Sequence, residues 1–537
     1  MTSGTFDLIV VGFGAAGVAA AIEAADAGAT VLAIDRGFGG GATALSGGIV
    51  YAGGGTRYQR AAGVDDDPDN MFRYLTQEVR GAVSDDTLRR FCDESAETIS
   101  WLERQGASFQ ASLAPFKTSY PTDRHYLYYS GNEKAHPYKG HARPAPRGHR
   151  QIAKGLGSGK VLYSRLKASA LKKGVVFLPH TTVDELIIED GTVVGVRYRS
   201  ADERNLPASY ARRSVLAAKA GNWAPAIGER VAATLQRDWE SAARPGEARG
   251  RAVLLSGGGF VHNPEWMKKW SGPYRDISPL GTAADDGGAI SLGLSAGGAT
   301  DHMDRMTAWR FINPPSAMAE GVVVDGAGQR IANEDLYGAT FADHMVREHD
   351  ARGYLILDSK QWRKARRQIR TQTNSFQLLQ LLYLYTIGHR KGRDLSALAR
   401  KLDLPVNATA ATITAYNSGI LSGAGDPAGK APELSSTVMS GPFFAVDLSV
   451  KNSPFYPAPG LTLGGLKVDE QSGGVLTEAG QVIPGLFAAG RSAVGVCSVG
   501  YISGLSIADC FFSGRRVGRI VARAVEATAD PAESAAL

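Results

Sequence analysis

Cysteine is scarce in this sequence, with only Cys92, Cys497 and Cys510 among 537 residues. An odd number of cysteines with no Cys-x-x-Cys pair excludes a disulfide framework and a cysteine-based zinc site, and it favours a reducing compartment. Apolar runs are short as well, and none reaches the roughly 18 residues of a membrane-spanning helix. The apolar stretch from Leu8 is interrupted by glycines and follows no basic segment, unlike a signal peptide. The sequence therefore predicts a cytoplasmic protein without a transmembrane helix.

Excess charge of either sign is also small. The 59 Lys and Arg residues against 53 Asp and Glu give a net charge of +6, which does not indicate a nucleic-acid partner. The histidines at 125, 136, 141 and 149 follow no metal-ligand spacing, so no metal site is expected. What the chain does have is glycine, 65 residues, many of them next to apolar strands. Such clustering indicates close approach of the backbone to a ligand.

The first glycine turn, Gly12-x-Gly14-x-x-Gly17, lies between an apolar strand and an alanine-rich helix, and a second strand ends at Asp35. In this setting Gly12 permits a tight turn, and Gly14 lets a diphosphate approach the helix N-terminus. Gly17 lets the helix pack on the strand, and Asp35 can accept hydrogen bonds from a ribose. The pattern predicts a dinucleotide-binding βαβ unit.

A second glycine loop, residues 39–48 (GGGATALSGG), follows Asp35 closely, and Gly53-Gly54-Gly55 comes next. A loop of this composition suits backbone wrapped around a large flat cofactor, which favours FAD over NAD. Further strand-to-glycine turns occur at 252–260 and 485–491, and the glycine-containing segment 282–289 opens a further helix. We expect them to return to the same nucleotide-binding unit.

Glycine turns are rare between about 304 and 440. The predicted fold is therefore α/β, with a Rossmann-like FAD-binding domain built from residues 1–303 and 441–537 and an α+β capping domain, residues 304–440, inserted in it. Residues 211–250 read as a helical surface insertion. Within the predicted cap, a basic run at 363–370 precedes an apolar run at 376–385. This pair could form a peripheral contact with a membrane surface, or an amphipathic helix beside a core helix.

The motifs DLIVVGFGAAG, SGGIV, AVLLSGGGF, LTLGGLKVD and PGLFAAGR follow one another along nearly the whole chain. In this order they resemble the fumarate reductase and 3-ketosteroid dehydrogenase superfamily of FAD enzymes. The resemblance implies a discontinuous FAD domain, an inserted cap and an active site between them. Members with covalently bound FAD carry a histidine in the Ser-Gly-Gly loop. Residues 42–46 are Ala-Thr-Ala-Leu-Ser, so non-covalent FAD is expected.

Fumarate reductases in this superfamily clamp a dicarboxylate with arginine and histidine. After Asn333-Glu334, where they carry an arginine, this chain has Tyr337, and its C-terminal motif Gly500-Tyr501-Ile502-Ser503-Gly504 lacks both charged residues. Tyr-x-Ser after the AAG turn is similar to the Δ4-(5α) ketosteroid dehydrogenases, as is the segment YLYYSGNE at 126–133. The Δ1 enzymes carry Tyr-Pro-x-Pro-Gly after that turn, whereas this chain has YPAPG at 456–460, before LTLGG.

The resemblance implies dehydrogenation of a 3-keto-5α-steroid between C4 and C5, with hydride transfer to flavin N5. Tyr501 would stabilise the enolate, and Ser503 would take the α-proton and pass it through Tyr337 to solvent. Tyr337, Tyr501 and Gly504 would bind the steroid. The residues expected to bind the cofactor are Gly12, Gly14, Ala15, Ala16, Gly17, Asp35, Arg36, Ala42, Thr43, Ser46, Gly47, Gly48, Val183, Gly257, Gly258, Asp286, Gly490, Arg491, Ser503, Leu505 and Ser506.

Three other functions stay open from the sequence. One is a 3-ketosteroid Δ1-dehydrogenase, and another is a fumarate-reductase-like reductase of an enoyl substrate. The third, of a different class, is a flavin-bearing electron carrier or sensor. Any dehydrogenase of this kind also requires a further electron acceptor to reoxidise the flavin.

Overall fold

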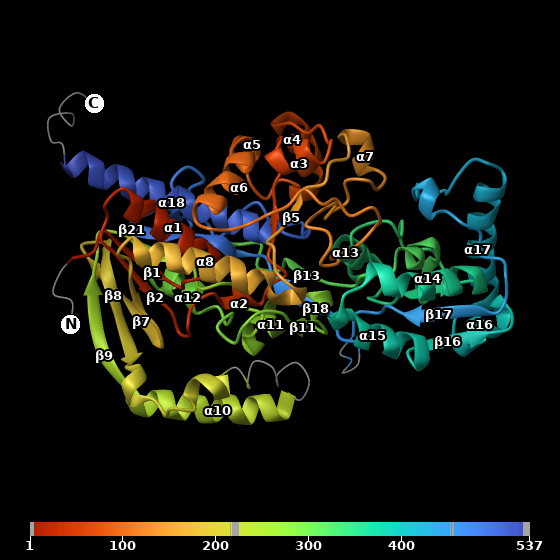
Figure 1. Ribbon diagram of the computed structural model, residues 1–537. Helices are drawn as coiled ribbons and strands as arrows, with labels where there is room; N and C mark the ends of the chain where they lie inside the picture. Colours follow the sequence, from red (N-terminus) through yellow and green to blue (C-terminus); the bar gives the residue numbers. More distant parts are fainter. Residues whose placement is uncertain (1–4, 215, 217–224, 452, 454–455, 530–537) are drawn as a thin grey trace.

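A six-stranded sheet forms the centre of the larger part of the molecule (Figure 1). The computed structural model describes residues 5–214, 216, 225–451, 453 and 456–529. All strands of this sheet run parallel except β20, and their order is β20 (Gly474–Leu476), β21 (Val482–Ala488), β10 (Val253–Leu255), β1 (Leu8–Val11), β2 (Val31–Ile34) and β6 (Val176–Leu178). The residues of β1, β2 and β10 are all buried and apolar, as expected of parallel strands covered on both faces.

Two long helices pack side by side against this sheet. They are α1 (Ala15–Asp26), which follows the first glycine turn, and α18 (Leu505–Ala529), which follows the C-terminal motif. Gly514 and Gly518 of α18 permit the close approach, because a Cβ at Gly514 would lie 2.2 Å from the Ala16 carbonyl oxygen. The helix after the first glycine turn and the helix after the C-terminal motif therefore pack together as a pair.

An antiparallel sheet of β7 (Thr181–Glu189), β8 (Thr192–Ala201) and β9 (Ala243–Arg249) lies beside the central sheet. The predicted helical insertion at 211–250 is correct for α10 (Pro225–Ala242) and wrong for β9, which pairs with residues 195–201 of β8. Its sequence, ARPGEAR, is a poor strand by composition, but an edge strand tolerates proline. Residues 215 and 217–224 of the predicted insertion lie outside the described residues.

The smaller part of the molecule is built on a second, antiparallel sheet with the order β14 (Val322–Val324), β15 (Tyr354–Leu357), β17 (Phe443–Asp447) and β16 (His389–Gly392). Five helices accompany it: α13 (Gly338–Glu348), α14 (Ser359–Gln372), α15 (Ser375–Thr386), α16 (Leu395–Lys401) and α17 (Val406–Leu421). This mixture of helices and antiparallel strands beside a parallel sheet confirms the predicted fold class. β17 begins after residue 440, so the second sheet extends beyond the expected insert.

Shorter elements connect these parts. Between β2 and β6 lie α2 (Gly41–Leu45), β3 (Ile49–Tyr51), α3 (Arg57–Ala61), α4 (Pro68–Val79), α5 (Asp85–Asp93), α6 (Ser95–Arg104), β4 (Leu127–Tyr128), α7 (Tyr138–His141), β5 (Gly148–Arg150), η1 (Gly155–Gly157) and α8 (Ser158–Lys172). After β10 come α11 (Pro264–Trp270), β11 (Ser278–Pro279), α12 (Gly288–Ser295), β12 (Thr300–Asp301), β13 (Met306–Ala308), η4 (Ser316–Glu320), β18 (Pro459–Thr462) and β19 (Gly465–Leu466). Of the helices described, none is long and apolar enough to span a bilayer.

Candidate active site

The predicted cofactor residues gather at one edge of the central sheet. Gly12 follows β1, Asp35 follows β2, Gly257 follows β10 and Gly490 follows β21. These strands are parallel neighbours, so their carboxyl ends meet at the same edge. This is the edge at which open α/β sheets bind ligands.

Glycine is required at this edge for close backbone packing. Gly12 has φ +96°, and a Cβ there would lie 2.6 Å from the Gly257 Cα atom. Gly258 has φ +93°, and a Cβ there would lie 2.5 Å from an Asp285 carboxylate oxygen. Gly17 lies over Gly12, and a Cβ at Gly17 would lie 2.2 Å from the Gly12 carbonyl oxygen. Glycine at this position therefore lets α1 pack closely on β1.

Side chains of the two predicted cofactor loops hold the edge together. Thr43 in α2 accepts a hydrogen bond from the Ala15 amide at 3.2 Å, and Asp35 accepts one from the Phe13 amide at 2.9 Å. The Arg36 guanidinium donates to both Asp286 carboxylate oxygens, at 2.7 and 2.6 Å. Arg36 and Asp286 are 250 residues apart in the sequence, so this ion pair brings together two of the predicted turns.

The remaining predicted cofactor residues lie around the same edge. Arg491 is largely buried and ion-paired with Asp285, and the Gly490 amide donates to Ser513 of α18 at 3.0 Å. Val183 lies in β7, two residues beyond Thr181, whose amide donates to the Asp35 carbonyl at 2.9 Å. Ala16 is in α1, Ala42 is in α2, Ser46, Gly47 and Gly48 follow α2, and Leu505 and Ser506 begin α18.

This arrangement fits a dinucleotide. Gly14 is the N-cap of α1 and makes no side-chain cap, so the first turn of that helix presents backbone amides to the glycine edge. Around a Cβ placed on Gly14 the nearest atoms are 3.8 Å away, in contrast to the crowded Gly12 and Gly17. A helix N-terminus with this open approach suits a diphosphate.

The predicted catalytic turn Tyr501–Gly504 lies directly before α18 and forms backbone hydrogen bonds with two other segments. The Ser503 amide donates to the Ser130 carbonyl at 3.2 Å, and the Tyr51 amide donates to the Gly504 carbonyl at 3.2 Å. Gly504 has φ +88°, and a Cβ there would lie 2.8 Å from the Tyr51 nitrogen. The turn is therefore held between β3, which follows the second glycine loop, and the segment after β4.

Two tyrosines approach the Ser503 hydroxyl. The Tyr128 hydroxyl is 2.9 Å from Ser503 Oγ, and the Tyr337 phenol lies beside the same oxygen. Burial raises the pKa of both tyrosines well above the usual value, although the Ser503 hydroxyl lowers each of them somewhat. Burial also raises the pKa of Tyr501, so all three phenols keep their protons. The structure thus brings together Tyr337, Tyr501 and Ser503 and adds Tyr128.

An aromatic row connects the two outer tyrosines. Trp309 lies between Tyr501 and Phe311, with ring centroids 5.5 and 5.8 Å away, and the Phe311 centroid is 5.5 Å from that of Tyr337. The buried Trp309 indole nitrogen has no hydrogen-bond partner among the described residues. Three protonated phenols, one hydroxyl and an aromatic wall form this site, and the Arg491 guanidinium, which acts on Tyr501, is paired with Asp285.

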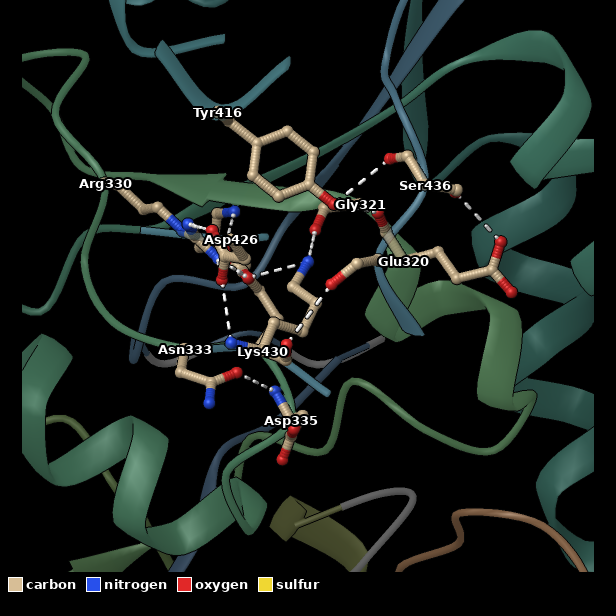
Figure 2. A network of polar contacts seen from close by, with 12 residues as sticks. Glu320, Gly321, Arg330, Asn333, Asp335, Tyr416, Asp426, Lys430 and Ser436 are labelled. Atoms are coloured by element: carbon tan, nitrogen blue, oxygen red, sulfur yellow. Dashed lines mark hydrogen bonds and ion pairs between the residues drawn. The ribbon is translucent and has the colours of Figure 1, made fainter. Parts of the chain in front are cut away.

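Tyr337 reaches this site because a buried charge network fixes the segment before it (Figure 2). The Arg330 guanidinium binds both Glu334 and Asp426, and the Lys430 Nζ atom lies 2.9 Å from a Glu334 oxygen and 2.6 Å from the Gly321 carbonyl. Glu334 and Lys430 are fully buried. Burial is the largest single effect and raises the pKa of the Glu334 carboxyl, but the charges and hydrogen bonds of Lys430 and Arg330 together outweigh it, so the pKa is lowered.

The same segment continues into α13 through two more contacts. Asp335 accepts the Ala431 amide at 2.9 Å, and its own amide donates to Asn333 at 2.9 Å. The Tyr337 amide then donates to the Asn132 side chain at 2.6 Å, which crosses from the smaller part of the molecule to the larger one. Tyr337 is thereby fixed at the junction of the two parts.

A second buried network supports the larger side of this junction. The Asn132 amide group donates to Glu78 at 2.7 Å and to Thr340 at 2.8 Å, and the Tyr74 hydroxyl donates to Glu78 at 2.6 Å. Burial raises the pKa of Glu78 to about 7, against the opposing effect of these hydrogen bonds. The Glu78 backbone packs under Gly500, where a Cβ would lie 2.0 Å from its carbonyl oxygen.

Several of these residues were not singled out from the sequence. Tyr128 appeared only within the segment 126–133, and no sequence signal distinguished it from its tyrosine neighbours. Trp309 and Phe311 are two aromatic residues separated by one position directly after β13. Such alternation is common in ordinary strands, so it does not by itself indicate a site. Asn132 and Glu78 act through contacts distant in sequence, which local patterns do not reveal.

Comparison with known proteins identifies relatives over nearly the full chain. Residues 7–504 match the FAD binding domain family. The chain is 37% identical to the 3-oxo-5-alpha-steroid 4-dehydrogenase of Comamonas testosteroni over 90% of this chain and 92% of that protein. It is 30% identical to the crystal structure of the 3-ketosteroid-delta4-(5alpha)-dehydrogenase of Rhodococcus jostii RHA1 in complex with 4-androstene-3,17-dione, with a TM-score of 0.81 and coverage of 97% and 98%.

A more distant structure shares the fold. The 3-ketosteroid delta1-dehydrogenase of Sterolibacterium denitrificans is 18% identical, with a TM-score of 0.67 and coverage of 97% of this chain and 100% of that one. These similarities confirm the resemblance drawn from the sequence motifs and the expectation of FAD. The chain belongs to the FAD binding domain family and is an FAD-dependent oxidoreductase homologous to 3-oxo-5-alpha-steroid 4-dehydrogenase.

Proposed function

We propose that this protein removes two hydrogens from a 3-keto-5α-steroid and forms the C4–C5 double bond. The observation that carries the proposal is the convergence of Tyr501, Ser503 and Tyr337, all neutral side chains, beside an aromatic wall. The similarity to the two Δ4 enzymes supports it. A neutral, apolar ketone is the class of substrate that such a surface can bind without leaving an unpaired charge.

Tyr501 binds the 3-keto oxygen in this proposal. Its raised pKa keeps the phenol protonated, so it donates a hydrogen bond to the carbonyl and holds the enolate that forms when the α-proton leaves. The backbone amide of Gly504, on the same turn, is the second donor that we propose. A donor aimed at the developing charge stabilises the transition state more than the ground state.

Ser503 takes the proton from C4. A serine hydroxyl is a weak base alone, so its own proton must move on as the new one arrives. Tyr337 lies beside Ser503 Oγ and belongs to the other part of the molecule, so we propose that it receives that proton and passes it toward solvent. Tyr128, at 2.9 Å, holds the orientation of the serine hydroxyl.

Bound FAD supplies the acceptor for the hydride that leaves C5. We propose that the cofactor is held non-covalently, because the loop at 39–48 contains no histidine. The residues that we propose to hold it are Gly12, Gly14, Ala15, Ala16, Gly17, Asp35, Arg36, Ala42, Thr43, Ser46, Gly47, Gly48, Val183, Gly257, Gly258, Asp286, Gly490, Arg491, Ser503, Leu505 and Ser506. We further propose that residues 1–303 and 441–537 form the FAD-binding domain and that the capping domain, 304–440, continues through β17.

Two contacts argue against the alternative substrates. Arg310 is buried, and its guanidinium donates to the carbonyls of Leu448, Ser449, Tyr456 and Pro457, so it has no free face for a dicarboxylate. Tyr456, in the motif that resembles the Δ1 enzymes, lies under the same guanidinium at 4.1 Å. Arg310 therefore gives no support to binding of a dicarboxylate, and Tyr456 gives none to a Δ1-dehydrogenase site.

The proposal is tested by anaerobic titration of the FAD-loaded protein. Adding 5α-androstane-3,17-dione should bleach the oxidised flavin absorbance, and succinate at the same concentration should not. The double bond in the product is then located by mass spectrometry and NMR. Bleaching by succinate, or a double bond at C1–C2, would contradict the proposed reaction, and no bleaching by either compound would favour an electron carrier.

A further inference from the structure

The positive charge of this protein is concentrated in one short segment. Between Ser359 and Arg393 the sequence has nine Lys and Arg residues and no Asp or Glu. This exceeds the net charge of +6 for the whole chain, so the rest of the chain is net negative. The segment comprises α14, α15 and β16, which lie together at the end of the molecule farthest from β9 and the C-terminus (Figure 1).

Most of these cations are not neutralised by the protein itself. Lys364 pairs with Glu320, and Arg393 pairs with the adjacent Asp394. The other seven have no carboxylate partner in the part of the chain that the structure describes, and they are Lys360, Arg363, Arg366, Arg367, Arg370, Arg390 and Lys391. Exposed and unpaired positive charge of this density is available to an anionic partner.

The helix between the basic residues carries an exposed apolar face. α15 buries Leu381 and Leu384, yet Leu378, Leu379 and Leu382 are 47%, 56% and 60% exposed. Residues at these spacings share one face of a helix. Ile387, one residue after the helix, is 70% exposed. The expectation of a core helix beside an amphipathic one therefore does not describe α15, which has apolar residues on both its buried and its exposed sides.

The apolar surface extends across the junction toward the cofactor loops. Leu156 in η1, which packs against α15, is 48% exposed. Asn374, the N-cap of α15, donates to the Pro121 carbonyl at 2.9 Å. The neighbouring Tyr120 hydroxyl donates to Gly47, in the second glycine loop, at 3.2 Å. Exposed leucines and the cofactor loop are thus joined by a short chain of contacts.

We propose that α15, with Leu156 and Ile387, docks on a membrane surface that contains anionic phospholipids. A helix with an apolar face and surrounding Lys and Arg residues binds in the interface of such a bilayer, with its apolar side chains among the acyl chains and its cations at the headgroups. If two copies of this chain docked through the same patch, the seven unpaired cations of one copy would face the seven of the other. This repulsion disfavours a dimer through the patch.

This docking has a consequence that rests on the proposed steroid substrate. A sterol-like ketone partitions into bilayers, so a protein seated on the surface draws on a higher local concentration than one in solution. The contacts from α15 through Pro121 and Tyr120 to Gly47 place the lipid-facing helix next to the loop that we assign to the cofactor. The docking surface itself depends only on the leucines and the unpaired cations.

The test is co-sedimentation of the full FAD-loaded chain with vesicles. We expect at least about tenfold more protein to pellet with phosphatidylcholine vesicles containing phosphatidylglycerol than with phosphatidylcholine alone, and high salt to reverse most of this difference. Replacing Leu378, Leu379 and Leu382 together with glutamine should abolish pelleting. The pair Arg366→Glu and Arg370→Glu should reduce it about tenfold or more.

Two controls keep the result specific. Leu421→Gln, at a leucine that is 67% exposed at the end of α17, should pellet as the wild type does. The triple glutamine variant should keep its FAD content and its turnover of steroid supplied in solution, which shows that it is folded. Equal pelleting of the triple variant and the wild type, or no preference for the anionic vesicles, would overturn the proposal. A dimer in light scattering that the triple variant dissociates would assign the patch to a second copy instead and would likewise overturn it.

Discussion

The two tyrosines at Ser503 are expected to differ in what they contribute, and a pair of single substitutions separates them. Tyr128→Phe removes a hydroxyl that is 2.9 Å from Ser503 Oγ and leaves the ring in place. A buried hydrogen bond between neutral groups contributes about 0.5–1.5 kcal/mol. Since about 1.4 kcal/mol corresponds to a factor of ten in rate, flavin reduction should slow by about 2- to 12-fold. Tyr337→Phe interrupts the proposed proton path, so its loss should be about 10²- to 10⁴-fold.

The assay is anaerobic stopped-flow reduction of the bound flavin by saturating steroid, with the steroid dissociation constant measured separately. Tyr129→Phe is the matched control, because Tyr129 follows Tyr128 in the chain and its ring contacts Lys134. We expect it to be as fast as the wild type. A solvent deuterium isotope effect should change in the Tyr337 variant and stay the same in the Tyr128 variant. If Tyr128→Phe is as slow as Tyr337→Phe, Tyr128 conducts the proton, and the assignment of an orienting role is wrong.

Three further substitutions test other parts of the argument. Tyr501→Phe removes the proposed enolate donor and should lower kcat about 10²- to 10³-fold with unchanged FAD content, and full activity would contradict the assignment. Burial raises the pKa of Glu78 from 4.5 to about 7, so its contribution to stability is present below about pH 4.5 and is lost as the pH rises through about 7, by up to about 3 kcal/mol. Glu78→Gln should remove that part of the pH dependence in urea titrations at about pH 5 and about pH 8, and parallel curves for both proteins would refute it. Lys430→Met leaves Glu334 with one cation fewer and should lower the free energy of unfolding by about 3–5 kcal/mol, whereas an unchanged Tm would show that Arg330 alone is sufficient.

Local patterns were sufficient to predict the cofactor edge of the sheet. Gly12, Asp35, Gly257 and Gly490 each lie within two residues of the end of an apolar strand, and the carboxyl ends of neighbouring parallel strands must meet. Their convergence therefore follows from the order of strand and turn alone. The pairing of Arg36 with Asp286 does not, because it depends on where α12 is placed after β10.

The rest of the site depends on contacts that have no local signature. Tyr128 and Tyr129 are adjacent and chemically identical, and only the pairing of β4 with β5 decides which of them faces Ser503. The strand β9 forms because β8 offers an unpaired edge, against the composition of its own residues. For α15 the apolar run left a core helix and a membrane-surface helix open, and only the tertiary structure shows that Leu378, Leu379 and Leu382 are exposed among the described residues.

Burial at the junction has two consequences that support one another. It raises the pKa of Tyr128, Tyr337 and Tyr501, so these groups stay protonated and can donate. It also makes the site costly for a charged substrate, because the buried Arg310 already binds backbone carbonyls and cannot act as a counter-ion. A ketone requires a neutral donor and an apolar wall, and both come from the same exclusion of water. The same exclusion of water therefore disfavours a dicarboxylate and keeps the phenols protonated, so that they can stabilise an enolate.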